Sequence, residues 1–409
     1  MSRPAAEVAV TGLGLVTPAG IGVAANWRRV LSGVSTAAPD DRLRDCPVAF
    51  SCRVPDFDPD ALLGGFAARQ LARYTQLAVV AVREAVADAG WDPRTWDGAR
   101  VAVVFGTSFG GVESYESAYE ALAGRGPRAV SPLTIPMHLV NMVAGQLAID
   151  IGARGPSQVT ATACASGATA VGTGRELLRR GDCDIVVAGA AEAALTPLVV
   201  TGLARMGALS GRADAPAEAS RPFDRDRDGF VPAEGAGALV LERAADARAR
   251  GRRPRVLVGG YGASTDAHHV TSPAPGGEGI ERALREALRD AGVDGTDVDH
   301  VNAHGTSTPL GDVVEGRMLR RVLGARAAVT STKGVTGHPL AAAGAIEAAY
   351  TALAVGAGTA PPTANLTHLA PELDLDVVAG VPRDLPIDVA VSMSMGFGGH
   401  NAALVLTAT

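Results

Sequence analysis

The feature that most constrains the fold is an alternation of short apolar runs with longer segments of helical spacing. The short runs predict strands at Val8–Thr11, Val101–Phe105, Ser157–Ala161, Ile185–Ala188, Ala238–Leu241, Val256–Val258, His300–Asn302, Val389–Met393 and Ala403–Leu406. The longer segments predict helices at Arg69–Ala89, Met137–Ile149, Ala165–Arg180, Gly279–Asp290, Asp312–Val322 and Leu340–Val355. This alternation is typical of α/β proteins, in which helices cover the sheets.

The chain divides near a polar, Pro-containing segment, GRADAPAEASRPFDRDRDG at residues 211–229, which predicts a long loop. Each side opens with an apolar strand that runs into a Gly turn, VAVTGLG at 8–14 and VLVGGYG at 256–262. This likeness is too short to prove a repeat. We expect an N-terminal half over residues 1–250 and a C-terminal half over 251–409.

Charge and hydropathy limit the partners and the location. The formal net charge of −6 argues weakly against nucleic acid. The N-terminus shows no basic start followed by a long apolar run, so we expect no secretory signal, a cytoplasmic location and free thiols. The apolar segment HPLAAAGAIEAAYTALAVGAG carries Glu347 in its middle, which favours a buried helix over a membrane span.

Cys164 lies in the stretch ATACASGATA (161–170), between a predicted strand and a predicted helix. A thiol at a helix N-terminus faces free N–H groups and the positive end of the helix dipole, which lowers its pKa. A strand–turn–helix placement is typical of a nucleophile on a sharp turn. We interpret the small neighbours as room for a thioester to reach the sulfur. A buried structural cysteine is the alternative.

Two histidines follow apolar runs in the second half. His304, in VNAHGTSTPLGD, ends a predicted strand, and Thr306 and Thr308 follow it. His338, in STKGVTGHPLAAAGAIE, precedes an apolar helix whose N-terminus favours the neutral imidazole. The same motif holds Lys333, the only lysine among 37 Lys and Arg residues, which indicates a need for a compact ammonium. Each histidine alone could be a core or capping residue, and the lysine a chance survivor.

No metal or nucleotide motif is complete. The Cys and the two His lie far apart in the sequence without paired short spacings, so we expect no zinc site. DRDRDGFVPAE (224–234) begins like a calcium loop, but Glu234 stands at position 11 instead of 12 and Pro232 at position 9. We therefore predict a structural loop there. Neither TGLGLVTPAG nor GTGRELLRRG completes a dinucleotide fingerprint.

Five motifs in order, TACASG, FDRDRDGFVPAEGAG, VNAHGTSTPLGD, STKGVTGH and GFGG, resemble the elongating β-ketoacyl-acyl carrier protein synthases of the thiolase superfamily. The resemblance covers essentially the whole chain. It implies a thiolase-like five-layered αβαβα fold from two similar halves, and a dimer. It also implies decarboxylative Claisen condensation of an acyl-cysteine with malonyl-acyl carrier protein, in type II fatty acid or polyketide synthesis.

The resemblance also implies roles for single residues. Cys164 matches the nucleophile, His304 and His338 match the pair that promotes decarboxylation, and Lys333 matches a lysine that orders the site through Glu347. The backbone N–H groups of Cys164 and Phe397 match the oxyanion hole. The remaining substrate-binding candidates are Thr306, Thr308, Thr271, Phe109 and Phe397, the last also as a gate. The enzyme itself is expected to bind no cofactor, because the acyl carrier protein carries the phosphopantetheine.

The chain departs from this pattern at the gate, where Met393 and Met395 replace an Asn and a Phe of many relatives. The ring of Phe109 should shorten the acyl pocket, so we expect short or medium acyl chains. Candidates for docking the carrier protein are Arg69, Arg73 and Arg205.

The main alternative function is a catalytically silent chain-length factor, which would lack the cysteine. The dimer partner could be the same chain or such a homologue. A thiolase or an initiating condensing enzyme is disfavoured by His338.

Overall fold

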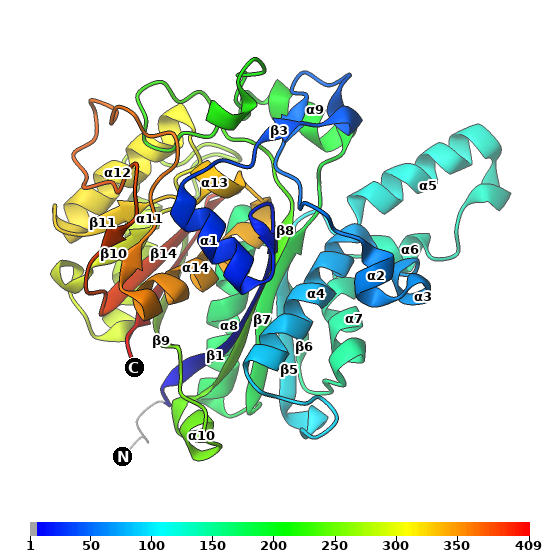
Figure 1. Cartoon of the computed structure of the whole chain (residues 1–409), viewed down its shortest axis with the longest axis horizontal. Coiled ribbons are helices and arrows are strands. Elements are labelled where there is room, and N and C mark those ends of the chain that lie inside the picture. The colour runs from blue at the N-terminus through cyan, green and yellow to red at the C-terminus, as the bar shows by residue number, and fades with distance from the viewer. Residues whose placement is uncertain (1–5) are drawn as a thin grey trace.

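The computed structural model describes residues 6–409, so residues 1–5 of the predicted N-terminal half lie outside it (Figure 1). All the predicted strands are present: β1 (Val8–Thr17), β5 (Val101–Gly106), β6 (Ser157–Thr160), β7 (Ile185–Glu192), β8 (Gly235–Arg243), β9 (Val256–Thr265), β10 (His300–Asn302), β14 (Val389–Gly396) and β15 (His400–Thr407). The predicted helices correspond to α4 (Arg73–Asp88), α7 (Met142–Ile151), α8 (Ser166–Arg180), α11 (Glu278–Ala291), α12 (Pro309–Leu323) and α14 (Ala343–Ala357).

Some element boundaries differ from the prediction. The helix predicted from Arg69 begins at Arg73, and the one predicted from Met137 is split into α6 (Thr134–His138) and α7. Elements that the apolar pattern did not predict are β2 (Gly20–Ile21), α1 (Val23–Ser32), β3 (Ala38–Pro39), β4 (Phe50–Ser51), α2 (Pro59–Leu63), α3 (Gly65–Ala68), α5 (Val112–Arg125), α9 (Pro197–Arg205), α10 (Ala244–Ala249), β11 (Ala328–Thr330), α13 (Lys333–Thr336), β12 (Thr359–Ala360) and β13 (Arg383–Asp384).

The strands form two sets with the same topology. Their order in the main sheet is β11-β10-β14-β15-β9-β1-β8-β7-β5-β6. In one half β5 pairs in parallel with β6 and β7, and β8 joins β7 to β1 by antiparallel pairing. In the other half β10 pairs in parallel with β11 and β14, and β15 joins β14 to β9 in the same way. The two sets meet only through a short pairing of β1 with β9.

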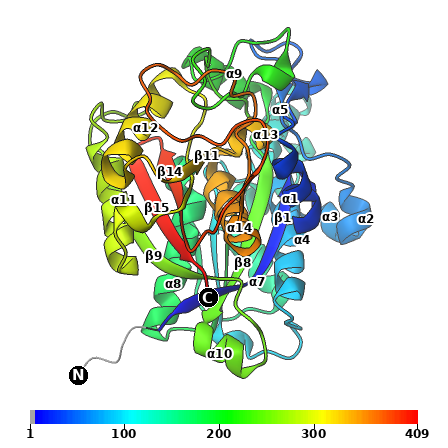
Figure 2. The same cartoon turned by 60° about the vertical axis from the view of Figure 1, so that its left-hand side comes forward.

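The helices and the two sets of strands make five layers. Helices α8 and α14 pack together in the centre, and their apolar side chains form one core with strands of both halves. In Figure 2, α14 lies between β1 and β8 on one side and β14 and β15 on the other. Helices α4 and α7 cover the outer face of the N-terminal strands, and α11 and α12 cover that of the C-terminal strands. The predicted αβαβα arrangement of two similar halves is confirmed.

The prediction of Gly turns at 8–14 and 256–262 is wrong, because these glycines lie inside β1 and β9. Their presence there has one physical cause. Gly14 on β1 lies under α4, where an added Cβ would stand 1.8 Å from the Ala81 carbonyl oxygen. Gly262 on β9 lies under α11, where an added Cβ would stand 2.0 Å from the Ala283 carbonyl oxygen. In each half the outer helix therefore approaches its strand so closely that only glycine fits.

The apolar segment near residue 350 is a core helix. Residues 340–357 are long and apolar enough to cross a membrane, but 78% of this window is buried inside the protein, as the sequence predicted. By contrast, α5 extends away from the body of the protein (Figure 1). Several of its apolar side chains are exposed.

Candidate active site

Cys164 lies in the short 3-10 turn η4 (Ala163–Ala165), between β6 and α8. The preceding residue, Ala163, has a φ of 49°, a left-handed conformation that side chains other than glycine seldom adopt. The Ser166 hydroxyl braces this turn because it accepts from the Thr162 N–H at 2.9 Å and donates to the Ala163 carbonyl at 2.6 Å. The predicted sharp turn before a helix is therefore present.

Two of the small residues beside Cys164, Gly167 and Ala168, are explained by helix packing, a cause that the sequence interpretation did not include. An added Cβ on Gly167 would stand 2.4 Å from the Ala345 nitrogen of α14, and one on Gly344 of α14 would stand 2.5 Å from the Ala168 nitrogen. The two central helices thus cross in backbone contact at this point. The crossing requires glycine at positions 167 and 344, whereas Ala163 lines a cavity beside Cys164, and room for substrate stays a prediction there.

The expectation of a lowered thiol pKa is wrong for this structure. Only 8% of Cys164 is exposed. Burial raises the pKa of the thiol to about 12, although the charge of Lys333 and the backbone N–H of Phe397 lower it. The thiol is therefore protonated at neutral pH, and its proton must leave during acyl transfer.

Cys164 opens into a cavity of about 410 Å³ that gathers nearly all the predicted site residues. The residues that line it include Cys164, His304, His338, Thr306, Thr308, Thr271, Phe109 and Phe397. They come from separate loops of both halves, which the fold brings to one side of the sheet. The predicted clustering of these residues is confirmed, and their individual roles stay predictions.

The two histidine rings lie edge to face, with 5.3 Å between the ring centroids of His304 and His338. Burial lowers the pKa of both imidazoles well below the ordinary value, and the Lys333 charge lowers it further. Both rings are therefore neutral at physiological pH, as predicted for His338, although burial is the main cause. Within residues 6–409 neither Nδ1 has a hydrogen-bond partner, which is uncommon for buried polar atoms.

Lys333 and Glu347 form a fully buried ion pair behind His304. The Lys333 ammonium donates to Glu347 Oε1, and also to the His304 carbonyl oxygen at 2.7 Å. Burial raises the pKa of Glu347 to about 7, and the lysine charge opposes that rise. The predicted pairing of the single lysine with Glu347 is confirmed. The ammonium fixes the backbone of His304 directly.

Two buried carboxylates of α12 hold the His304 loop and were not predicted. Glu315 accepts the N–H groups of His304 and Gly305, each at 2.7 Å, and Asp312 accepts from the Ser307 N–H at 3.1 Å. Burial raises the pKa of Glu315 to about 7. Asp312 and Glu315 are three residues apart in a helix that begins at Pro309. This spacing could have suggested that both carboxylates lie on the same face of the helix.

Comparison with known proteins fits this geometry. Residues 5–247 match the β-ketoacyl synthase N-terminal domain, and residues 256–367 match the β-ketoacyl synthase C-terminal domain. A 3-oxoacyl-[acyl-carrier-protein] synthase 2 of Staphylococcus aureus is 42% identical over 404 residues, which cover 98% of this chain and 97% of the relative. The chain belongs to the β-ketoacyl synthase family.

Solved structures of other ketosynthases share the fold of this β-ketoacyl synthase. The ishigamide ketosynthase/chain length factor superposes with a TM-score of 0.93 at 33% identity, covering 99% of both chains. A ketosynthase of the AntDE:AntF complex, a type II polyketide synthase ketosynthase with its acyl carrier protein, superposes with a TM-score of 0.92 at 31% identity, covering 99% of both chains.

The Gly-rich turn of this β-ketoacyl synthase joins β14 to β15 beside Cys164. An added Cβ on Gly396 would stand 2.5 Å from the Thr162 carbonyl oxygen, so the turn packs against the cysteine elbow. The backbone N–H of Phe397 faces the Cys164 sulfur, as expected of an oxyanion-hole donor. Met395 lines the cavity, whereas Met393 is fully buried in the C-terminal core.

Arg73, one of the arginines predicted to dock the carrier protein, is instead held in an ion pair inside the protein. Arg73 donates two hydrogen bonds to the buried Glu234 carboxylate, at 2.7 and 2.6 Å, so it is not free for a partner. Arg69 and Arg205 are exposed. Arg205 ends α9 directly before Met206, which lines the cavity, and it is the better placed of the two.

The segment that begins like a calcium loop is a structural connection, as predicted. Burial disfavours ionisation of Asp224, but hydrogen bonds from the N–H groups of His368, Asp226 and Thr367 lower its pKa to about 2. Asp228 accepts from the Ser210 hydroxyl at 2.6 Å. Among residues 6–409 no group of three His, Cys, Asp or Glu side chains could hold a metal ion, and the four cysteines are free.

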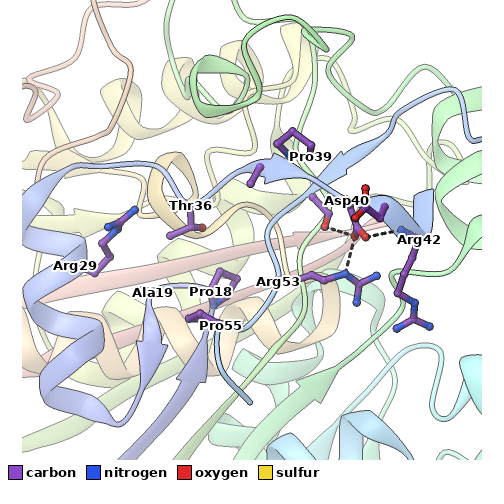
Figure 3. Close-up of a pocket in the computed structure, with 12 residues that line it drawn as sticks. Pro18, Ala19, Arg29, Thr36, Pro39, Asp40, Arg42, Arg53 and Pro55 are labelled. Atoms are coloured by element: carbon purple, nitrogen blue, oxygen red, sulfur yellow. Dashed lines mark hydrogen bonds and ion pairs between the residues drawn. The ribbon is translucent and has the colours of Figure 1, made fainter. Parts of the chain in front are cut away.

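A second cavity, of about 620 Å³, lies beside α1 and the β3–β4 ribbon and contains none of the predicted site residues (Figure 3). Its buried carboxylate, Asp40, accepts hydrogen bonds from Arg53 at 2.6 Å and from Ser51 at 2.7 Å. Arg42 pairs with Glu113 at the same rim. These four charged side chains are therefore paired, Asp40 with Arg53 and Arg42 with Glu113.

Proposed function

We propose that the chain is an active elongating ketosynthase, which condenses an acyl group held on Cys164 with malonyl-acyl carrier protein to give β-ketoacyl-acyl carrier protein. The observation that carries this proposal is the meeting of Cys164, His304 and His338 in one cavity. A catalytically silent chain-length factor would have no use for this thiol and its two neutral imidazoles.

The first half-reaction is acyl transfer. The Cys164 sulfur attacks the acyl thioester of the carrier protein, and the pantetheine sulfur leaves and takes up the proton that Cys164 loses. The N–H of Phe397, which faces the sulfur, and that of Cys164 stabilise the oxyanion of the tetrahedral intermediate. The neutral imidazole of His304, which lines the same cavity, can accept the proton that Cys164 loses and pass it on.

The second half-reaction is decarboxylative condensation. The malonyl thioester loses CO2, and the electron pair of the broken bond forms an enolate. Neutral His304 and His338 donate hydrogen bonds to the enolate oxygen, and the Lys333–Glu347 pair holds His304 in place. The enolate carbon then attacks the acyl carbonyl, and the Cys164 sulfur leaves and regains a proton.

The substrates are presented by the acyl carrier protein, which carries the phosphopantetheine. The hydroxyl groups of Thr306 and Thr308 lie 3.0 Å apart on the cavity wall, and Thr271 also lines the cavity. This placement supports their role as contacts of the pantetheine arm.

We propose that the carrier protein docks at Arg69 and Arg205. We also propose a dimer with a second copy or a chain-length-factor homologue, and a cytoplasmic location. We further propose that residues 1–250 supply the nucleophile and residues 251–409 supply the histidines and the lysine.

The chain-length preference is proposed from Phe109. Its ring lines the cavity, so it limits the depth available to an acyl chain and favours short or medium chains. Phe109→Ala is expected to raise the activity toward long acyl chains relative to short ones by about tenfold, from the volume of the ring removed. An unchanged ratio, together with equal use of long and short chains by the wild type, would contradict this preference.

The proposed function is tested with acyl- and malonyl-acyl carrier proteins of graded chain length. Intact-mass measurement should detect both acyl-Cys164 and the carrier protein extended by two carbons. No acylation of the wild type, or equal acylation of Cys164→Ala, would refute the mechanism. The same series with fatty acyl and polyketide starters separates the two pathways.

A further inference from the structure

Glu192, the last residue of β7, is a fully buried carboxylate that the mechanism does not use. Among residues 6–409 it forms no ion pair with an arginine, lysine or histidine. Burial raises its pKa to about 7. A buried carboxylate without a counter-ion is costly, so its hydrogen bonds indicate what it does.

Among residues 6–409, the hydrogen bonds of the Glu192 side chain to other elements all go to one turn. The Ser108 N–H donates to Oε2 at 2.8 Å and the Phe109 N–H donates to the same oxygen at 3.4 Å. The Thr107 hydroxyl donates to Oε1 at 3.2 Å and accepts from the Gly110 N–H at 3.2 Å. One carboxylate therefore holds the complete turn that follows β5.

The opposite side of this turn is also fixed. Gly110 has a φ of 56°, and an added Cβ on Gly111 would stand 1.9 Å from the Met137 carbonyl oxygen. The turn lies between Glu192 and the end of α6, and it has little room to shift. Phe109 and Ser108 line the cavity that contains Cys164.

We propose that Glu192 is a positioning residue for acyl-chain selectivity: it fixes the Thr107–Gly110 turn, and through it the Phe109 ring that sets the depth of the cavity. This inference rests on the proposed function, because depth matters only to an enzyme that holds an acyl chain. The carboxylate suits the task because both its oxygens accept, and an amide would place a donor against the Thr107 hydroxyl or the backbone N–H groups.

The test compares Glu192→Gln with the wild type on acyl carrier proteins of graded chain length. Loss of one charge-assisted contact should let the turn and the ring move, raising the long-to-short ratio of kcat/KM by about tenfold. In the Phe109→Ala background the same substitution should leave the ratio unchanged, because no ring remains to be positioned. Thr107→Val, which removes one hydroxyl at constant size, should raise the ratio less, and it replaces the first variant if that one does not fold.

A matched control is Glu242→Gln, a buried carboxylate of β8 that pairs with Arg250 and lies outside the cavity. It should lower stability while the long-to-short ratio stays at the wild-type value. A ratio unchanged in Glu192→Gln and Thr107→Val, with the wild type active, would overturn the role of Glu192. An equal change in the Phe109→Ala background would overturn it too. No acylation of the wild type would instead count against the proposed function.

A second readout tests whether the Glu192 charge reaches the active cysteine. Burial is the main cause of the raised pKa of the Cys164 thiol, and the Glu192 charge raises it further. Glu192→Gln should therefore lower the pH midpoint of Cys164 alkylation, while the other charges facing the thiol, Lys333 and Glu347, stay in place. Glu242→Gln should leave this midpoint where it is.

Discussion

The two central helices begin in the same way, and only one of them carries a nucleophile. Each follows a 3-10 turn, η4 before α8 and η7 (Leu340–Ala342) before α14. The first residue of each turn has a positive φ, 49° at Ala163 and 45° at Leu340. The second residue is Cys164 in the N-terminal half and Ala341 in the C-terminal half.

In the proposed mechanism, this difference divides one reaction between two halves of the same topology. Cys164 lines the cavity, whereas Ala341 is fully buried and the C-terminal half contributes Lys333 and His338 from the residues before its turn. The glycine that follows each turn by two residues, Gly167 or Gly344, serves the crossing of the helices in both halves. Geometry and small residues are therefore shared, and only the chemistry differs.

The largest effect is expected from removing the nucleophile. Cys164→Ala should lower condensation by at least about 10⁴-fold, because acyl transfer has no other acceptor in the cavity. Decarboxylation of malonyl-acyl carrier protein should persist, because the residues proposed to promote it belong to the other half. Intact-mass analysis and CO2 release measure the two steps.

Moving the thiol to the matching position sharpens this test. Cys164→Ala combined with Ala341→Cys should stay inactive, since Ala341 does not reach the cavity. Cys46→Ala, which changes a half-buried thiol elsewhere, should keep wild-type activity. Acylation restored by Ala341→Cys would mean that the two turns are interchangeable and that the division of labour is wrong.

A substitution in the C-terminal half is expected to slow decarboxylation and to spare acyl transfer. His338→Asn should slow decarboxylation by about 10²- to 10⁴-fold while acyl transfer to Cys164 stays within a fewfold of the wild type. Because the pKa of His338 lies well below its ordinary value, the wild-type rate should not fall through imidazole protonation between about pH 8 and 6.5. His368→Asn, an exposed histidine, is the control. Equal loss of both half-reactions would contradict separate roles.

The helix crossing predicts equal damage in the two halves. Gly167→Ala and Gly344→Ala should each lower the free energy of unfolding by about 3 kcal/mol, because the new methyl group meets backbone of the facing helix. Gly202→Ala, at an open position in α9, should be neutral or slightly stabilising. Urea unfolding measures all three. A small loss of stability at one of the two glycines and a large loss at the other would contradict an equivalent role of the crossing in the two halves.

Sequence patterns predicted the main strands and helices because their apolar residues face large cores. They did not predict α5, which extends into solvent with little apolar periodicity, or β11, which has only three residues. The site residues Cys164, His304, His338 and Lys333 were found through their motifs. Glu192 and Glu315 were missed because their role lies in contacts with distant backbone N–H groups. The pKa of Cys164 was mispredicted because its burial depends on tertiary packing.

The smallest effect concerns the first residues of matching strands, Val101 in β5 and His300 in β10. Burial lowers the pKa of His300 to about 4, against an ordinary value of 6.5. Between these values the unfolded chain binds more protons than the folded one, so stability falls as the pH falls. His300 should therefore cost the protein about 2 kcal/mol at pH 5 relative to pH 7. His300→Val should remove this loss, measured by urea unfolding at both pH values. If the variant and the wild type lost the same stability between pH 7 and pH 5, His300 would not be the cause, and β10 would be as insensitive to pH as β5.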